Sequence, residues 1–81
     1  MDIKTDLIKR LTDADVNNDP QFRELMRQSI ELLGLDHNDI AEELNMSKPT
    51  VERWLRGTSV PHPALRQTVF KILTNKLNGI N

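Results

Sequence analysis

The side chains best suited to chemistry in this chain of 81 residues lie close together, in the stretch SKPTVER from Ser47 to Arg53. They offer two hydroxyls, an ammonium, a carboxylate and a guanidinium. No nucleophile–base pair with plausible spacing, no glycine-rich phosphate loop and no set of metal ligands accompanies them in the sequence. These groups therefore suit hydrogen bonding and ion pairing with another molecule. We predict that the protein is not an enzyme, has no catalytic residues, and needs no cofactor or metal ion.

Two short helices joined by a tight turn are predicted to position these side chains. Asp36 caps the first helix, and a second acid three residues later completes a capping-box-like pattern. Asn45 stands where the turn needs a left-handed residue, and asparagine is the best choice after glycine. Ser47 caps the second helix and Gly57 closes it. Residues 36–57 thus predict a helix-turn-helix, a motif whose second helix enters the major groove of DNA.

The inward face of this motif is predicted from its apolar residues. Ala41 is small, which lets the two helices cross closely. Val51, Trp54 and Leu55 recur at helical spacing and form the inward face of the second helix. Trp54 has the ring of a base-stacking residue, but its place three residues after Val51 favours the core.

Three further helices are predicted around the motif. The first runs from residue 2 to about residue 14, within an N-terminal segment formed by residues 1–18. Asp19 caps the second helix, which has Pro20 in its first turn and ends at Leu33. His62 precedes a proline and therefore caps the last helix, which covers residues 62–78.

The apolar stripes of these helices predict one core. They comprise Ile3, Leu7, Ile8 and Leu11 in the first helix, Phe22, Leu25, Met26, Ile30 and Leu33 in the second, and Leu65, Val69, Ile72, Leu73 and Leu77 in the last, with Phe70 on its border. Since strand signals are missing, we predict an all-α fold, a five-helix bundle that forms a single domain over residues 1–81. The first stripe fits a lid on the core or a dimerisation face, and core packing is favoured because a small bundle needs the area.

The net charge is −1, but the charged residues are unevenly distributed along the chain. Residues 1–46 carry eleven acids and five bases, a balance of −6, whereas residues 47–81 carry six bases and one acid, a balance of +5. The bases begin at Lys48, where the second helix of the motif begins, as expected for a nucleic-acid interface. Uneven charge also arises by chance in small proteins.

The chain has no cysteine, which excludes a disulfide framework and cysteine-based zinc or redox sites. No apolar run approaches the length of a membrane span, and the N-terminal residues lack the apolar region of a signal peptide. We therefore expect a cytoplasmic protein without membrane association.

The stretch DIAEELNMSKPTVERWLRG resembles the helix-turn-helix of the phage-repressor-like family of bacterial regulators, the Cro and XRE type. The similarity continues through the loop TSVP and covers about residues 22–73. Its constrained positions are Ile40, Ala41, Leu44, Ser47, Val51, Trp54, Gly57 and Pro61. The resemblance implies a lambda-repressor-like domain, to which this chain adds an N-terminal helix.

The resemblance also implies which residues touch DNA bases. Lys48, Pro49 and Arg53 would face base edges, with Thr50 and Glu52 beside them. Arg53 can bind guanine O6 and N7 in bidentate fashion, and Lys48 can read guanine or hold a phosphate. Glu52 can accept from cytosine N4 or instead pair along the helix with Lys48 or the basic residue at position 56.

A second set of residues is implied to contact the DNA backbone, namely His37, Ser47, Arg56, Thr58 and Ser59. Such contacts position a protein without reading the sequence. Three departures from the family pattern matter: Pro49 offers only apolar contact, Leu55 replaces a frequent glutamate, and the C-terminal helix of the family after Leu73 has no counterpart. The dimer interface of the family therefore cannot be transferred.

We accordingly expect a sequence-specific DNA-binding transcriptional regulator that reads the major groove of double-stranded DNA with residues 47–56, with repression as the family default. Few contacts per half-site favour a homodimer on a palindromic site. One alternative is an antitoxin-like or accessory subunit that binds a protein partner through the N-terminal helix. Another is a protein-interaction module that keeps the helix-turn-helix shape without binding DNA.

Overall fold

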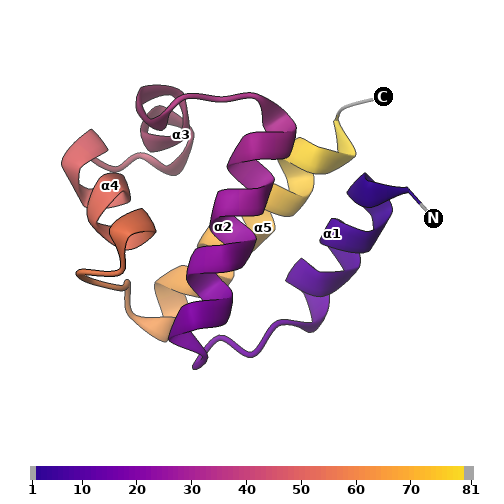
Figure 1. The fold of residues 1–81 in the computed structure, drawn as a ribbon, viewed down its shortest axis with the longest axis horizontal. Helices are drawn as coiled ribbons and strands as arrows, with labels where there is room; N and C mark the ends of the chain where they lie inside the picture. The colour runs from indigo at the N-terminus through magenta and orange to yellow at the C-terminus, as the bar shows by residue number, and fades with distance from the viewer. Residues whose placement is uncertain (1, 80–81) are drawn as a thin grey trace.

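Five α-helices and no strand make up residues 2–79, the part of the chain described by the computed structural model (Figure 1). The helices are α1 (Ile3–Asp13), α2 (Asp19–Leu33), α3 (His37–Leu44), α4 (Lys48–Arg56) and α5 (Pro63–Asn78). The predicted all-α fold with five helices is confirmed.

Local hydrogen bonds explain where these helices begin. Asp36 and Asp39 form the predicted capping box of α3, and Nδ1 of His62 accepts from the Ala64 amide at the start of α5. The predicted cap of α2 is wrong by one residue. Asn18 Oδ1 accepts from the Gln21 amide at 3.0 Å, which makes Asn18 the N-cap and Asp19 the first helical residue. Both residues are good caps, so the sequence pattern alone did not separate them.

The core gathers buried apolar side chains from all five helices. Phe22 lies at its centre, because its ring stands edge-on to Trp54, with centroids 6.1 Å apart, and tilted against Phe70 at 5.5 Å. Trp54 is therefore a core residue, as predicted. The buried set is Leu7, Leu11, Phe22, Leu25, Met26, Ile30, Ile40, Ala41, Leu44, Val51, Trp54, Val69, Phe70, Leu73 and Leu77.

The outer helices depart from the predicted stripes. Leu7 and Leu11 are buried, so α1 is part of the core, but the predicted inward residue Ile3 is 71% exposed. On α5, Phe70 is buried rather than at the border, while Leu65 and Ile72 are only partly buried. The reason is that α5 packs against both α1 and α2, which shifts its buried face toward Phe70.

A buried arginine ties the start of α5 to the turn before α2. Arg66 is 5% exposed, and its side chain donates from Nε to the Pro61 carbonyl at 2.8 Å and from Nη1 to the Val16 carbonyl at 2.6 Å. Nη1 also pairs with Asp19 Oδ1 at 2.7 Å, and the guanidinium lies 5.7 Å from the ring centroid of Phe22. Arg66 is thus a structural anchor, although sequence analysis counted it with the basic C-terminal half.

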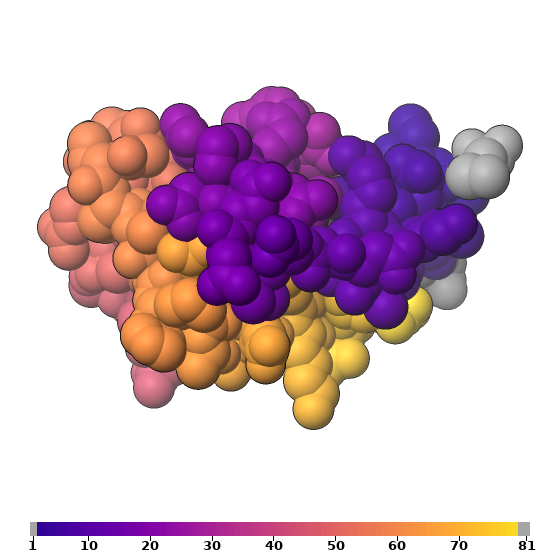
Figure 2. Space-filling view, turned by 90° about the horizontal axis from the view of Figure 1, so that it is seen from below, coloured from indigo at the N-terminus to yellow at the C-terminus, as the bar shows by residue number. Residues whose placement is uncertain are grey.

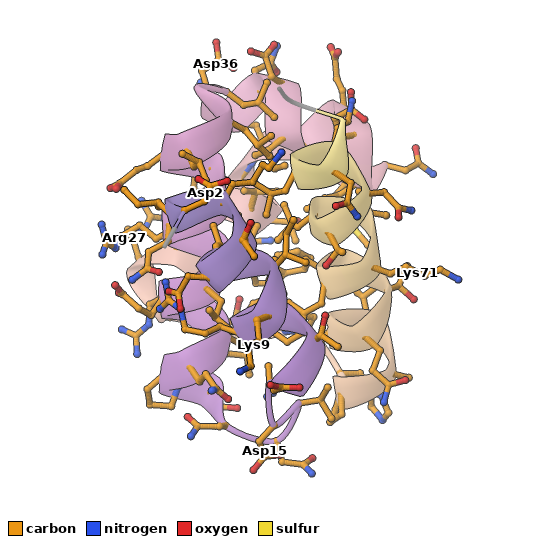
Figure 3. The ribbon with its side chains drawn as sticks, turned by 90° about the vertical axis from the view of Figure 1, so that its right-hand side faces the viewer. Asp2, Lys9, Asp15, Arg27, Asp36 and Lys71 are labelled. Carbon is orange, nitrogen blue, oxygen red and sulfur yellow. The ribbon has the colours of Figure 1, made fainter. Side chains whose placement is uncertain are left out.

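The helices are arranged with α3 and α4 at one end, α1 at the other, and α2 and α5 between them (Figure 1). Seen from below, the beginning of α2 occupies the middle of the surface, between the α4 end and α1 (Figure 2). From the α1 side, Lys71 projects from α5 on one flank and Arg27 from α2 on the other (Figure 3). The face of α4 that is turned away from the core therefore lies far from α1.

Candidate nucleic-acid interface

The turn between α3 and α4 is tight because of Asn45. This residue adopts the left-handed conformation with φ 56°, and it is the only residue other than glycine with positive φ in the described chain. The next amide, that of Met46, donates to the Ala41 carbonyl at 2.9 Å, which satisfies the end of α3. Ala41 is itself buried between the helices, as predicted for a small residue at a close crossing.

Helix α4 has two distinct faces. Val51 and Trp54 are buried, and Leu55 is partly buried against the core. On the opposite side, the predicted base-contacting residues Pro49 and Arg53 are exposed, and Lys48 is exposed in the first turn of the helix. The predicted base-contacting residues Thr50 and Glu52 are half-buried. The structure thus brings all five together on one helix, with three of them free of any packing duty.

Hydrogen bonds connect three of the polar residues along the exposed side of α4. Ser47 Oγ caps the helix by accepting from the Thr50 amide at 3.3 Å, and it lies 2.7 Å from the Thr50 hydroxyl. Arg53 Nη2 donates to the same Thr50 hydroxyl at 3.2 Å. Ser47, predicted to contact the DNA backbone, therefore has a structural duty as the cap of α4.

Glu52 has a partner that sequence analysis did not identify. Its Oε2 lies 3.2 Å from Nδ1 of His37, at the first residue of α3, so the pair bridges the two helices. Of the two alternatives for Glu52, the ion pair along α4 with Lys48 or Arg56 is therefore not formed, and the contact with cytosine N4 stays a prediction. His37 was predicted to hold a phosphate, and its ring is half-exposed at the same end of the molecule.

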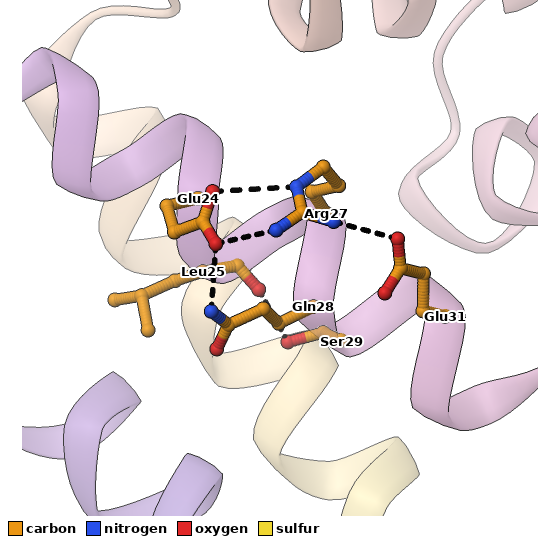
Figure 4. Close-up of polar contacts among 6 residues, drawn as sticks. All are labelled: Glu24, Leu25, Arg27, Gln28, Ser29 and Glu31. Atoms are coloured by element: carbon orange, nitrogen blue, oxygen red, sulfur yellow. Dashed lines mark hydrogen bonds and ion pairs between the residues drawn. The ribbon is translucent and has the colours of Figure 1, made fainter.

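None of the cations of α4 forms an ion pair with a carboxylate among the described residues. Within residues 2–79, the side chains of Lys48 and Arg56 form neither a hydrogen bond nor an ion pair. By contrast, Arg27 on α2 is held by Glu24 and Glu31, whose carboxylates surround it in Figure 4. Two of the six bases in residues 47–81 do not add to the free positive charge of the surface. Arg66 is buried, and Lys76 pairs with Glu43 at 2.8 Å.

Pairing shifts the pKa values of Glu24 and Arg27 on α2. Hydrogen bonds from Arg27 and Gln28 hold the pKa of the Glu24 carboxyl below its ordinary value. The same contact with Glu24 raises the pKa of Arg27. These shifts belong to an exposed surface cluster (Figure 4) and not to the α4 face.

The loop after α4 is also well defined. Gly57 takes φ 80°, and the amide and hydroxyl of Thr58 both donate to the Arg53 carbonyl, at 3.1 and 3.2 Å. Thr58 and Ser59, both predicted to contact the DNA backbone, are exposed beside Arg56. A β-carbon placed on Gly57 would lie 2.6 Å from Nη1 of Arg23, so the guanidinium of this α2 residue lies against the end of α4.

Arg23 is the one cation near this end that sequence analysis missed. Its side chain forms no hydrogen bond or ion pair within the described residues, and it adds positive charge beside the loop from Gly57 to Ser59. No local sequence signal could have placed it there, because the contact joins residues far apart in the chain. With Lys48, Arg53 and Arg56 it forms what we call the α4 cation surface.

No helix among the described residues is long and apolar enough to cross a membrane. The same part of the chain has no cluster of three or more histidine, cysteine or acidic residues placed to hold a metal ion. Comparisons with protein-family models, with curated proteins and with solved structures found no match for this chain.

Proposed function

We propose that this protein is a sequence-specific DNA-binding transcriptional regulator of the phage-repressor-like type, acting as a repressor, and that α4 enters the major groove. The observation that carries the proposal is the division of α4. One side supplies Val51 and Trp54 to the core, the other exposes Arg53 and Arg56, and Lys48 is exposed in the first turn; among the described residues the side chains of Lys48 and Arg56 have no hydrogen-bond or ion-pair partner. A short capped helix with this division can enter a groove that accepts an α-helix, while the core holds it at a fixed angle.

The neighbouring groups support the same assignment. The α3 N-terminus, with His37 beside it, and the exposed loop residues Thr58 and Ser59 flank α4 and suit contacts to phosphates. Arg23 extends the positive surface on the loop side. Lys48 and Arg53 are the groups proposed to reach base edges, and Pro49 offers apolar contact to a thymine methyl.

Binding as a homodimer on a palindromic site is part of the proposal. The domain measures 33 × 25 × 18 Å, and half-sites on consecutive turns of DNA lie about 34 Å apart. Two copies therefore fit side by side on one face of the duplex. A single copy exposes few groups to DNA, so two copies are needed for tight binding.

The test is binding to mixed-sequence duplex DNA, followed by fluorescence anisotropy between about 50 and 200 mM salt. We expect affinity to fall steeply as salt rises, and each lost phosphate contact to reduce the slope of log K against log salt by about 0.9. Lys48→Ala combined with Arg53→Ala should weaken binding, whereas Arg10→Ala, which removes a cation from α1 that pairs with Asp6, should not. Absence of binding by the wild-type protein at low salt would overturn the proposal.

A second candidate function is binding of a protein partner at the α1 end. Ile3 is 71% exposed and Leu32 is 36% exposed, and both line a groove of about 330 Å³ between α1 and α2. Helix α1, which lines the groove, lies at the opposite end of the molecule from α4 (Figure 1), so a partner there would leave the α4 cation surface free. Ile3→Asp should abolish capture of such a partner without weakening DNA binding. Equal loss of both activities would speak against a separate partner site.

A further inference from the structure

We propose that Thr50 is a positioning residue that orients Arg53 for one base, rather than a residue that reads a base itself. This inference rests on the proposed function of α4 as a DNA reader. The inference goes beyond that function because it makes recognition of one base depend on both Arg53, which touches DNA, and Thr50, which does not.

The hydrogen bonds on α4 form a continuous chain. The Thr50 hydroxyl accepts from Arg53 Nη2 at 3.2 Å and lies 2.7 Å from Ser47 Oγ, which in turn accepts from the Thr50 amide at 3.3 Å. A hydroxyl has one proton and two lone pairs, and either hydroxyl of the Ser47–Thr50 pair can be the donor. When Thr50 donates to Ser47 it can still accept from Arg53, and all its capacity as a donor is then used within α4.

The hydrogen bond to Thr50 holds the guanidinium of Arg53 toward the N-terminal part of α4. Side chains in a helix lean toward its N-terminus, so Arg53 reaches back over the residue one turn earlier. The N-terminal part of a recognition helix is the part that meets base edges. The nearest carboxylate in sequence, that of Glu52, does not compete for the guanidinium because it is bound to His37.

The donor count leaves Arg53 competent to read guanine. A guanidinium carries five N–H donors, and bidentate recognition of guanine O6 and N7 needs two. In the described chain, Thr50 is the only group that the Arg53 side chain hydrogen-bonds, so one donor is engaged and the others stay free. The contact limits the rotamers of Arg53 before DNA arrives, which lowers the entropy lost on binding.

Arg56 provides an internal comparison. It lies on the same helix, is also exposed, and its side chain has no hydrogen-bond partner within residues 2–79. If the Thr50 hydroxyl orients Arg53, the two guanidinium groups should differ in order in the protein without DNA.

The first experiment measures that difference directly, by ¹⁵N relaxation of the arginine Nε–H groups in the free protein. We expect Arg53 to be more ordered than Arg56 in the wild type and in Thr50→Ser. In Thr50→Val, which keeps the shape but lacks the hydroxyl, Arg53 should become as mobile as Arg56. Equal order of the two groups in the wild-type protein would overturn the inference whether or not the protein binds DNA.

The second experiment selects duplexes from a random library with each variant and measures discrimination at every position of the enriched site. Arg53→Ala should abolish the preference for one guanine. Thr50→Val should reduce discrimination at that same guanine about three- to tenfold, whereas Thr50→Ser should stay within about twofold of wild type. Melting curves verify that each variant folds.

The outcomes separate the two proposals. If the wild type binds no duplex at low salt, both the proposed function and this inference are overturned. If Arg53→Ala acts but Thr50→Val changes no position, DNA reading stands and the positioning role of Thr50 falls. A loss in Thr50→Val at a different position would make Thr50 a base contact, and an equal loss on all sites would make it a phosphate contact.

Discussion

Replacement of Arg66 by methionine should destabilise the protein strongly. Methionine keeps an apolar chain against Phe22 but removes the donors to the carbonyls of Pro61 and Val16. A buried acceptor left without a donor costs about 1–3 kcal/mol, and the Val16 residue is only half-buried. The ion pair with Asp19 adds little, because the Asp19 side chain is 54% exposed.

We therefore expect the free energy of unfolding to fall by about 2–4 kcal/mol in Arg66→Met. A domain of this length has about 4–12 kcal/mol in total, so the variant loses a large share of its stability. The melting temperature should drop by about 8–32 °C, given about 4–8 °C per kcal/mol for a domain of this size. Urea unfolding followed by circular dichroism measures the change.

Two control variants test the reasoning behind that magnitude. Arg10→Met removes an exposed guanidinium that pairs only with Asp6 and should change stability by less than about 0.5 kcal/mol. Asp19→Asn removes the charge on the partner of Arg66 and should cost less than about 1 kcal/mol. If Arg66→Met were no more harmful than Arg10→Met, the two carbonyl contacts would not anchor the fold. If Asp19→Asn were as harmful as Arg66→Met, the ion pair would be the anchor instead.

Three further predictions concern the caps and the surface. Gly57→Ala should lower the free energy of unfolding by about 1–2 kcal/mol, measured by urea unfolding, because residue 57 has a left-handed backbone. We expect the same cost in an Arg23→Ala background, since the guanidinium of Arg23 can move away from the added β-carbon. A smaller cost in that background would show that the clash with Arg23 dominates. Asp36→Ala should cost about 1 kcal/mol and Asp36→Asn much less, because only alanine lacks the capping oxygen; equal losses would contradict this. Because the folded-state pKa of Glu24 is lowered, its stabilisation is present above the unfolded-state pKa and disappears as pH falls through the folded-state value. Glu24→Gln should thus melt below wild type at about pH 7 and together with it at about pH 2, and a constant gap would refute the linkage.

Features that depend on neighbouring residues were predictable from the sequence. The capping box at Asp36, the left-handed Asn45 and Gly57, and the inward position of Trp54 all follow from side chains a few residues apart. Two predictions from local sequence were wrong, the N-cap of α2 and the burial of Ile3. Asn18 and Asp19 are both good caps, and Ile3 fits the periodic pattern of α1 but stays exposed beside an open groove between α1 and α2.

Features that depend on distant residues were not predictable. Glu52 has two cations at helical spacing, yet it pairs with His37, which is 15 residues away. Arg66 looks like one more surface base, yet it binds a carbonyl 50 residues earlier. The position of Arg23 against Gly57 is of the same kind. Each contact requires the packing of separate helices, and a single sequence records no distance between them.

The sequence by itself determined the helices, their caps and the side chains that α4 exposes, because these depend on hydrogen bonds and apolar periodicity within one or two turns. Tertiary structure alone decided which of the exposed charges remain available. Helix packing buries Arg66 and pairs Glu52 with His37 on α3. The side chains of Lys48 and Arg56 have no partner among the described residues. The physical reason is that charge neutralisation depends on separation in space, which the fold sets by bringing distant helices into contact.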